Sequence, residues 1–234
     1  MTARESEIIG LIRKEVKPAL GCTEPIAVAL AVSKAMEVIE EQGGAESTDW
    51  RMGTGFRLDV KVSGNILKNG MGVGIPGTGM VGLHIAAALG AVCGKSSYGL
   101  EVLNDLSEAA IGHAKGMLEV SSVSIGLAET DKKLYVRAEV KCDGHCSYAV
   151  IENDHDNIVE TGFDGKVLSS SAGQSCDEPV DQKSTLDYNL TVKEILEFAS
   201  GAAVCNLAAE DSVSGMRSKD EIFGIINGCQ RYVI

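Results

Sequence analysis

The stretch Gly21–Lys34, GCTEPIAVALAVSK, predicts a helix that is buried in the core of the fold. Thr23 suits the N-cap position, while Glu24 and Pro25 suit the first helical turn. The long apolar run that follows has the composition of a helix enclosed on all sides, and we expect it to continue to about Glu41. This helix is therefore the element around which the neighbouring segments should pack.

Cys22 stands directly before this helix. A thiol at that position lies near unpaired backbone N–H groups and the positive end of the helix dipole, and both favour the thiolate. The thiolate is the form of cysteine that attacks electrophiles and binds metals. The alternative is that Cys22 is buried as a small apolar residue, as free cysteines commonly are.

A second unusual stretch, Ser63–Gly79, reads SGNILKNGMGVGIPGTG and predicts a glycine-rich loop. Such loops can present backbone N–H groups and side-chain donors to a carboxylate or a phosphate. Gly72–Gly77 matches the dinucleotide pattern GxGxxG, but Pro76 would interrupt the helix start that this pattern needs. A plain surface loop remains the alternative. The polar side chains of the stretch are Ser63, Asn65, Lys68, Asn69 and Thr78.

The order of the other patterns predicts an α+β fold, with small-residue helices around the glycine-rich loop, then an antiparallel β block, then C-terminal helices. Further helices are expected at 5–20, 80–92 and 107–118, and a strand at 57–62. The β block comprises strands at 120–128, 134–142, 147–151, 157–162 and 166–169. The predicted regions are 1–118 (mixed), 119–170 (β), 171–190 (linker) and 191–234 (helical).

Composition narrows the classes of function. The net charge is −12, which disfavours binding to nucleic acid or to anionic membranes because both need basic patches. No apolar run is long enough to span a bilayer, and the polar residues after Met1 do not form a signal peptide. The seven cysteines are odd in number and predict free thiols in a reducing cytoplasm.

The segment Cys142-Asp143-Gly144-His145-Cys146 could suggest a metal site, with His155 as a further ligand. Asp-Gly is a strong hairpin-turn signal, however, so Cys142 and His145 are expected simply to flank a turn. A structural zinc site usually has its four ligands in spaced pairs, which this segment lacks.

Three segments together resemble the L-cysteine desulfidase family, which is related to the α chain of the iron–sulfur L-serine dehydratases. They are KPALGCTEPIAVALA (Lys17–Ala31), the Ser63–Gly79 stretch, and GHCSYAVIENDHDNIV (Gly144–Val159). The resemblance implies an oxygen-sensitive 4Fe-4S cluster held by only three cysteines, whose open iron acts as a Lewis acid. It implies α,β-elimination without pyridoxal phosphate, from L-cysteine to sulfide, ammonia and pyruvate, or from L-serine to ammonia and pyruvate.

The resemblance also implies roles for individual residues. Cys22 would be one cluster ligand, and Lys68 would act in catalysis, either as the carboxylate partner or as the base that removes the α proton. The residues expected to bind the substrate are Thr23, Glu24, Ser63, Asn65, Asn69 and Thr78.

Members of that family are substantially longer than this chain, and their second half should supply the other cluster cysteines. Cys205 and Cys229 do not lie in the expected surroundings. The chain is then a truncated product, one subunit of a split enzyme, or a degenerate relative without a cluster. We expect no cluster in the chain alone, and we expect self-association or a partner subunit. The alternative function is a non-catalytic subunit for small-molecule binding or assembly.

Overall fold

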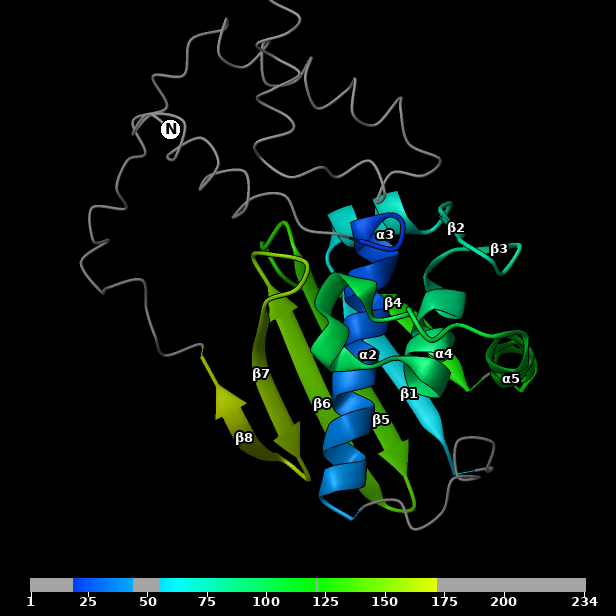
Figure 1. Cartoon of the computed structure of the whole chain (residues 1–234). Helices are drawn as coiled ribbons and strands as arrows, with labels where there is room; N and C mark the ends of the chain where they lie inside the picture. Colours follow the sequence, from blue (N-terminus) through cyan, green and yellow to red (C-terminus); the bar gives the residue numbers. More distant parts are fainter. Residues whose placement is uncertain (1–18, 44–54, 121, 172–234) are drawn as a thin grey trace, which may run out of the picture. The chain divides into compact units, whose positions relative to one another are not determined.

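A buried helix, α2 (Thr23–Glu41), lies at the centre of the part of the chain that the computed structural model describes, residues 19–43, 55–120 and 122–171 (Figure 1). These residues all fall in the first of the two units into which the chain divides, Met1–Gln174 and Ser175–Ile234. The helix expected at 5–20 and the linker expected at 171–190 lie almost wholly outside the described residues, and the C-terminal helices wholly so.

Helix α2 is enclosed on several sides, as its apolar sequence requires. Every side chain from Ile26 to Val32 is at most 1% exposed. The helix packs on the strands of the sheet and also on α4 (Leu83–Cys93). Its predicted span is confirmed, but the N-cap is Cys22 and not Thr23, and no side chain caps the helix there. The thiol is a poor capping group, so the helix start depends on packing instead.

Six strands form a mixed sheet in the order β4–β1–β5–β6–β7–β8. Only β1 and β4 are parallel, and all other neighbours are antiparallel. The predicted α+β class is confirmed. The strands are β1 (Arg57–Val62), β4 (Val123–Leu127), β5 (Tyr135–Cys142), β6 (His145–Glu152), β7 (Ile158–Phe163) and β8 (Lys166–Ser170).

The expectation of a separate antiparallel block is wrong in one respect. β1, from the first predicted region, lies between β4 and β5 and pairs with both. The chain leaves β1, passes through the helices and returns in the same direction as β4, which makes that one pair parallel. The regions predicted as 1–118 and 119–170 therefore share one sheet.

Two tight hairpins connect the last strands, as the sequence predicts. Asp143-Gly144 joins β5 to β6, and Asp164-Gly165 joins β7 to β8. All four residues have positive φ, between 46° and 85°, which is the backbone that a two-residue hairpin turn requires. These turns fix the register of the strands that lie beneath α2.

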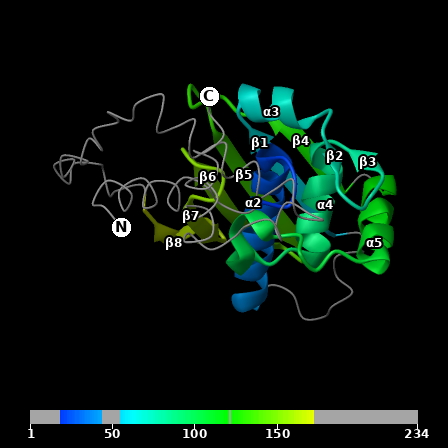
Figure 2. The same ribbon diagram turned by 45° about the horizontal axis from the view of Figure 1, so that its top comes forward.

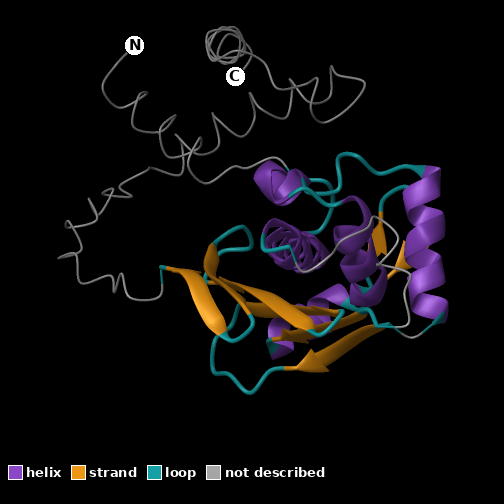
Figure 3. Ribbon diagram, turned by 90° about the horizontal axis from the view of Figure 1, so that it is seen from below, coloured by secondary structure: helices purple, strands orange, loops and turns teal. Residues whose placement is uncertain are grey.

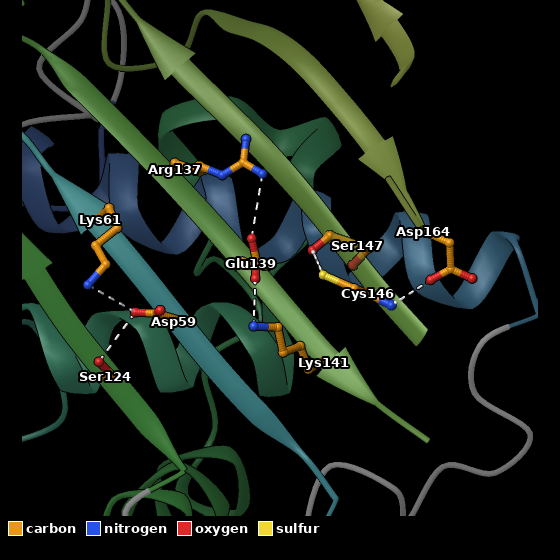
Figure 4. Close-up of polar contacts among 9 residues, drawn as sticks. All are labelled: Asp59, Lys61, Ser124, Arg137, Glu139, Lys141, Cys146, Ser147 and Asp164. Atoms are coloured by element: carbon orange, nitrogen blue, oxygen red, sulfur yellow. Dashed lines mark hydrogen bonds and ion pairs between the residues drawn. The ribbon is translucent and has the colours of Figure 1, made fainter. Parts of the chain in front are cut away.

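The two faces of the sheet differ in character. Side chains alternate along β5, with those facing α2 buried and the others partly exposed. Figure 3 shows the sheet nearly edge-on, with most of the helices on one side of it. Figure 4 looks onto the other face, where Glu139 accepts from both Arg137 and Lys141. Arg137 also stacks over the ring of Tyr148, with its guanidinium carbon 3.9 Å from the ring centroid. This face is therefore polar and largely internally paired.

The glycine-rich stretch is not one loop, in contrast to the prediction. It forms a short helix, α3 (Gly64–Gly70), and a small hairpin of β2 (Gly74–Ile75) and β3 (Met80–Val81). Gly77 and Gly79 have φ of 79° and 66°, so the hairpin tip needs glycine at both positions. The sequence did not predict α3 or this hairpin because segments of two to seven residues are too short to show a helical or strand period.

Helix α4 follows the hairpin and continues through a 3-10 turn, η2 (Ser96–Glu101), to α5 (Glu108–Glu119). Gly90 of α4 lies against the backbone of α2. A Cβ atom at this position would lie 2.8 Å from the Cα atom of Ala29 and would also meet the Ala29 carbonyl oxygen. The two helices can pack this closely only because residue 90 has no side chain. No helix among the described residues has the length and apolar character needed to cross a membrane.

We predict that Gly90→Ala destabilises the fold by about 1–3 kcal/mol, because the added methyl group would force α4 away from α2. The measurement is the free energy of unfolding from urea denaturation. Gly112→Ala is the matched control, since Gly112 lies in α5 with open space around its Cα. The control should be more stable by about 0.5–1 kcal/mol. Equal effects of the two changes would contradict the close contact.

Candidate functional site

Cys22 is exposed at the start of α2, so the alternative of a buried apolar cysteine is wrong. Its Sγ donates a hydrogen bond to Oε2 of Glu24, at 2.8 Å. Glu24 in turn accepts a hydrogen bond from Nδ2 of Asn69 to its Oε1, at 3.3 Å. Two segments that are 45 residues apart in sequence thus meet at one carboxylate. We call Cys22, Glu24 and Asn69 the thiol cluster.

The electrostatics of Cys22 differ from the sequence expectation of a thiolate. The hydrogen bond to Glu24 and then partial desolvation raise the pKa of Cys22, against smaller lowering contributions from backbone N–H groups. The pKa of Glu24 is lowered, first by the hydrogen bond from Cys22. The helix start does favour the thiolate, but the neighbouring carboxylate has the larger effect. Cys22 is therefore held as a protonated donor to an ionised glutamate.

Close backbone approaches build the surroundings of the thiol cluster. A Cβ atom at Gly70, the last residue of α3, would lie 3.6 Å from Cβ of Glu24. A Cβ atom at Gly21 would lie 3.3 Å from the ring of Pro76 in the β2–β3 hairpin. Figure 2 turns this end of the molecule toward the viewer, with α3, α2 and the hairpin gathered there. These contacts place α3 and the β2–β3 hairpin next to the start of α2.

The remaining residues of the predicted site divide into two groups. Asn65 and Lys68 are exposed on α3, the helix that also carries Asn69. Thr23 is the first residue of α2 and is half-buried. These side chains lie on the elements that form the thiol cluster. Asn65, Lys68 and Thr23 therefore lie at the same end of the described fold as the thiol cluster.

Ser63 and Thr78, by contrast, are at most 7% exposed and bind the backbone. The Ser63 hydroxyl donates to the carbonyl of Lys133 at 2.9 Å and accepts from N–H of Tyr135 at 3.3 Å. The Thr78 hydroxyl donates to the carbonyl of Ile75 at 2.8 Å and accepts from an N–H of the same hairpin. In this structure both hydroxyls hold the loops that flank the thiol cluster.

The described residues offer one thiol to a metal at this place and not a complete ligand set. No group of three or more histidine, cysteine or acidic side chains with metal-binding geometry occurs within 19–43, 55–120 and 122–171. Cys176, Cys205 and Cys229 lie outside these ranges. A cluster that needs three thiolates therefore does not fit the described residues alone, although an exposed thiol fits one position of such a cluster.

The segment around the Asp143-Gly144 turn has a structural role, as expected. Nδ1 of His145 lies 2.8 Å from Oδ2 of Asp164, and Oδ1 of the same carboxylate accepts from N–H of Cys146 at 2.8 Å. Asp164 therefore ties the two hairpin turns together. His155 lies apart from this group, in the connection between β6 and β7. The pKa of Glu24 is lowered first by the hydrogen bond from Cys22, and the charge of His155 makes a smaller lowering contribution.

The chain is similar to bacterial proteins that carry the name UPF0597. It is 40% identical over 196 residues to one from Phocaeicola vulgatus and 42% identical over 200 residues to one from Parabacteroides distasonis. It is also 41% identical over 190 residues to the UPF0597 protein YhaM of Salmonella paratyphi B. These alignments cover 81–85% of this chain but only 41–43% of each relative. The chain thus spans about two fifths of the length of these relatives.

These comparisons correct the resemblance drawn from the motifs. The relatives carry UPF0597 names, and none of those reported supports membership of the L-cysteine desulfidase or L-serine dehydratase families. No family model matches the chain, and no solved structure matches it significantly. The motifs that suggested the resemblance are short, and Lys17–Ala31 and Ser63–Gly79 are rich in alanine or glycine, which many folds use where backbones approach closely.

We predict that Glu24→Gln lowers the pKa of Cys22, because the thiol then loses the carboxylate that stabilises its protonated form. More thiolate is then present at neutral pH, and Cys22 should react faster with iodoacetamide. The measurement is the alkylation rate of Cys22 against pH, followed by peptide mass spectrometry. Glu37→Gln on the same helix is the control and should leave the profile unchanged. An unchanged profile in Glu24→Gln would contradict the role of this hydrogen bond.

Proposed function

We propose that this chain carries part of the active site of an enzyme that catalyses α,β-elimination from a small L-amino acid, without pyridoxal phosphate. The substrate would be L-cysteine, giving sulfide, ammonia and pyruvate, or L-serine, giving ammonia and pyruvate. Cys22 would supply one thiolate to a 4Fe-4S cluster whose other ligands lie outside the described residues. When bound, such a cluster supplies an open iron that can stabilise the departing sulfur or oxygen atom.

The observation that supports this proposal best is the thiol cluster. An exposed cysteine at a helix start is accessible to a metal group, and its thiol proton faces Oε2 of Glu24, 2.8 Å from Sγ. Loss of that proton is a condition for metal binding by cysteine. Asn69 donates to the second oxygen of the same carboxylate and keeps it oriented. The chain's own part in the reaction is then to present Cys22 in one fixed geometry.

Helix α3 would bind the substrate. Asn65, Lys68 and Asn69 all lie on this short helix, and the first two are exposed beside the thiol cluster. A lysine ammonium and an amide are suitable partners for the carboxylate of a free amino acid. Lys68 therefore holds the substrate carboxylate in this proposal. Ser63 and Thr78 support the loops on either side.

The surface around the cluster supports completion of the site by further protein. Leu20, Met71 and Val81 are 36%, 42% and 63% exposed, and each belongs to a segment that borders the thiol cluster. Exposed apolar side chains gathered near polar ones are typical of a surface that another part of a protein covers. The relatives extend well beyond the length of this chain, so the covering part would be the region that they have in addition.

A second candidate is a subunit that binds a small molecule or helps assembly without catalysis. The observation in its favour is the raised pKa of Cys22, since the hydrogen bond to Glu24 holds the thiol protonated. Such a subunit would bind an amino acid through α3 without iron. The two candidates differ in whether binding depends on a metal.

The test combines this chain with the region of a longer relative that has no counterpart in it, followed by anaerobic reconstitution with iron and sulfide. We expect the combined protein to retain iron after desalting and to form pyruvate from L-cysteine or L-serine. Cys22→Ala should lose both the iron and the activity. Cys93→Ala is the matched control, because this half-buried thiol on α4 bonds to the Leu89 carbonyl and lies in a different element.

Full iron content and activity in Cys22→Ala would contradict the proposed ligand. Amino-acid binding to the iron-free chain, with no pyruvate formed by the combined protein, would favour the second candidate. Isothermal titration with L-cysteine and L-serine under anaerobic conditions provides that measurement.

A further inference from the structure

Strand β4 forms one edge of the six-stranded sheet, because among the described residues it pairs with β1 alone. Just before the strand, the carbonyl of Ser122 accepts from N–H of Leu58 at 2.8 Å. Just after it, N–H of Ala128 donates to the carbonyl of Val62, also at 2.8 Å. Peptide groups alternate in direction along a strand, so the even-numbered residues of this segment face β1. The peptide groups that point away from the sheet therefore belong to Val123, Ile125 and Leu127.

β4 lacks the features that usually prevent an edge strand from pairing with another chain. Such features are a proline, a charged side chain on the strand, or a bulge that twists it away. The sequence of β4 is VSIGL, without proline or charge, and its register with β1 is regular. The opposite edge, β8, begins with Lys166 and pairs with β7 through a register shift. Of the two edges of the described sheet, β4 is therefore the one suited to accept a further strand.

Apolar side chains follow the β4 edge on one face of the sheet. The odd-numbered residues of β4 lie opposite buried residues of β1, so they share the face on which most of the helices lie. Val123 and Ile125 are partly exposed, and Leu127 is 61% exposed. Opposing apolar side chains of a second strand would cover these three residues.

We propose that β4 pairs with β4 of a second copy of this chain, antiparallel and about a two-fold axis at Ile125. Two-fold dimers are the commonest soluble oligomers, and this symmetry makes two identical edge strands antiparallel. Ile125 then lies opposite its own copy, and Val123 lies opposite Leu127 of the second copy. These pairs exchange both N–H···O bonds, because their peptide groups point across the edge. Every residue of β4 is paired in this register, and the two sheets continue into each other.

The other face of the edge provides charge complementarity between the copies. The side chain of Lys61 crosses Gly126 toward the edge, since a Cβ atom at Gly126 would lie 2.6 Å from Nζ of Lys61. The hydroxyl of Ser124 donates to Oδ1 of Asp59 at 3.3 Å (Figure 4). In the proposed register Gly126 lies opposite Ser124 of the second copy. The ammonium of Lys61 thus faces the Ser124–Asp59 pair of that copy, and the two-fold axis repeats the contact.

The same two charges contribute little within one chain. Nζ of Lys61 lies 3.7 Å from Oδ1 of Asp59, and both side chains are exposed. An exposed ion pair of this kind adds little to stability, so Lys61 can turn to the second copy at small cost. Gly126 has no side chain that would block this path, and glycine in a strand often marks the close approach of another group. This pairing does not depend on the proposed function.

The first measurement is the molar mass of the full chain in solution, by light scattering after size-exclusion chromatography. We expect a dimer. Leu127→Lys places a charge opposite the apolar Val123 and should raise the dissociation constant by about tenfold or more. Val167→Lys is the matched control, because Val167 is 56% exposed on the other edge strand, and this variant should remain dimeric. A monomeric wild-type chain, or equal effects of the two changes, would overturn the proposal.

The second measurement reverses the two charges. Lys61→Glu should raise the dissociation constant by about 2- to 30-fold, as the loss of two exposed ion pairs would. Adding Asp59→Lys restores opposite charges across the edge and should return the wild-type value. Lys141→Glu makes the same charge change on β5, away from this edge, and is the control. No weakening by Lys61→Glu, or weakening that Asp59→Lys fails to reverse, would contradict the proposed register.

The third measurement identifies the residue on the axis. In Ile125→Cys, a short bifunctional maleimide should join position 125 of one copy to position 125 of the other. A mixture of unlabelled and isotope-labelled chains shows by peptide mass spectrometry that the link is between copies. Val167→Cys is the control and should give no such link. A dimer that is linked through position 167 and not through position 125 would show that β4 is not the interface.

Discussion

The close contact between α2 and α4 is the constraint on which the described fold depends. Gly90 lets the backbone of α4 reach that of α2, and the sheet encloses α2 from another side. The middle of α2 is fully buried, so its side chains reach solvent only near the ends of the helix. Its first turn is therefore the place where α3, the β2–β3 hairpin and the solvent meet. The exposed polar side chains of Cys22, Glu24 and Asn69 meet there because the core encloses the middle of α2.

At that first turn two electrostatic effects oppose each other. The helix start stabilises an anion by about 0.3–1 kcal/mol at an exposed position. The hydrogen bond to the carboxylate of Glu24 has the larger effect and raises the pKa of the Cys22 thiol. The site is consequently a thiol with a built-in proton acceptor. A group that bound the sulfur would have to replace the thiol proton and so break the hydrogen bond to Glu24.

Patterns with a clear period were predictable from the sequence, and convergence in space was not. The span of α2, the α+β class and both Asp-Gly hairpins follow from apolar runs, alternation and turn residues. The parallel pairing of β1 with β4 depends on the path of the chain between them, which no local pattern encodes. Likewise, the polar residues of Ser63–Gly79 looked equivalent in sequence. In the folded chain Ser63 donates a hydrogen bond to a backbone carbonyl, whereas Asn69 donates one to Glu24.

The bond between Cys22 and Glu24 also bears on the chemical durability of the chain. Peroxide oxidises thiolates far faster than thiols, and exposed low-pKa cysteines are the ones converted to sulfenic acid. Cys22 is exposed, and its raised pKa leaves a smaller fraction of it as the readily oxidised thiolate. The glutamate thus lowers the fraction of this exposed sulfur that is in the form peroxide attacks. A cysteine can in this way be made less reactive while it stays exposed to solvent.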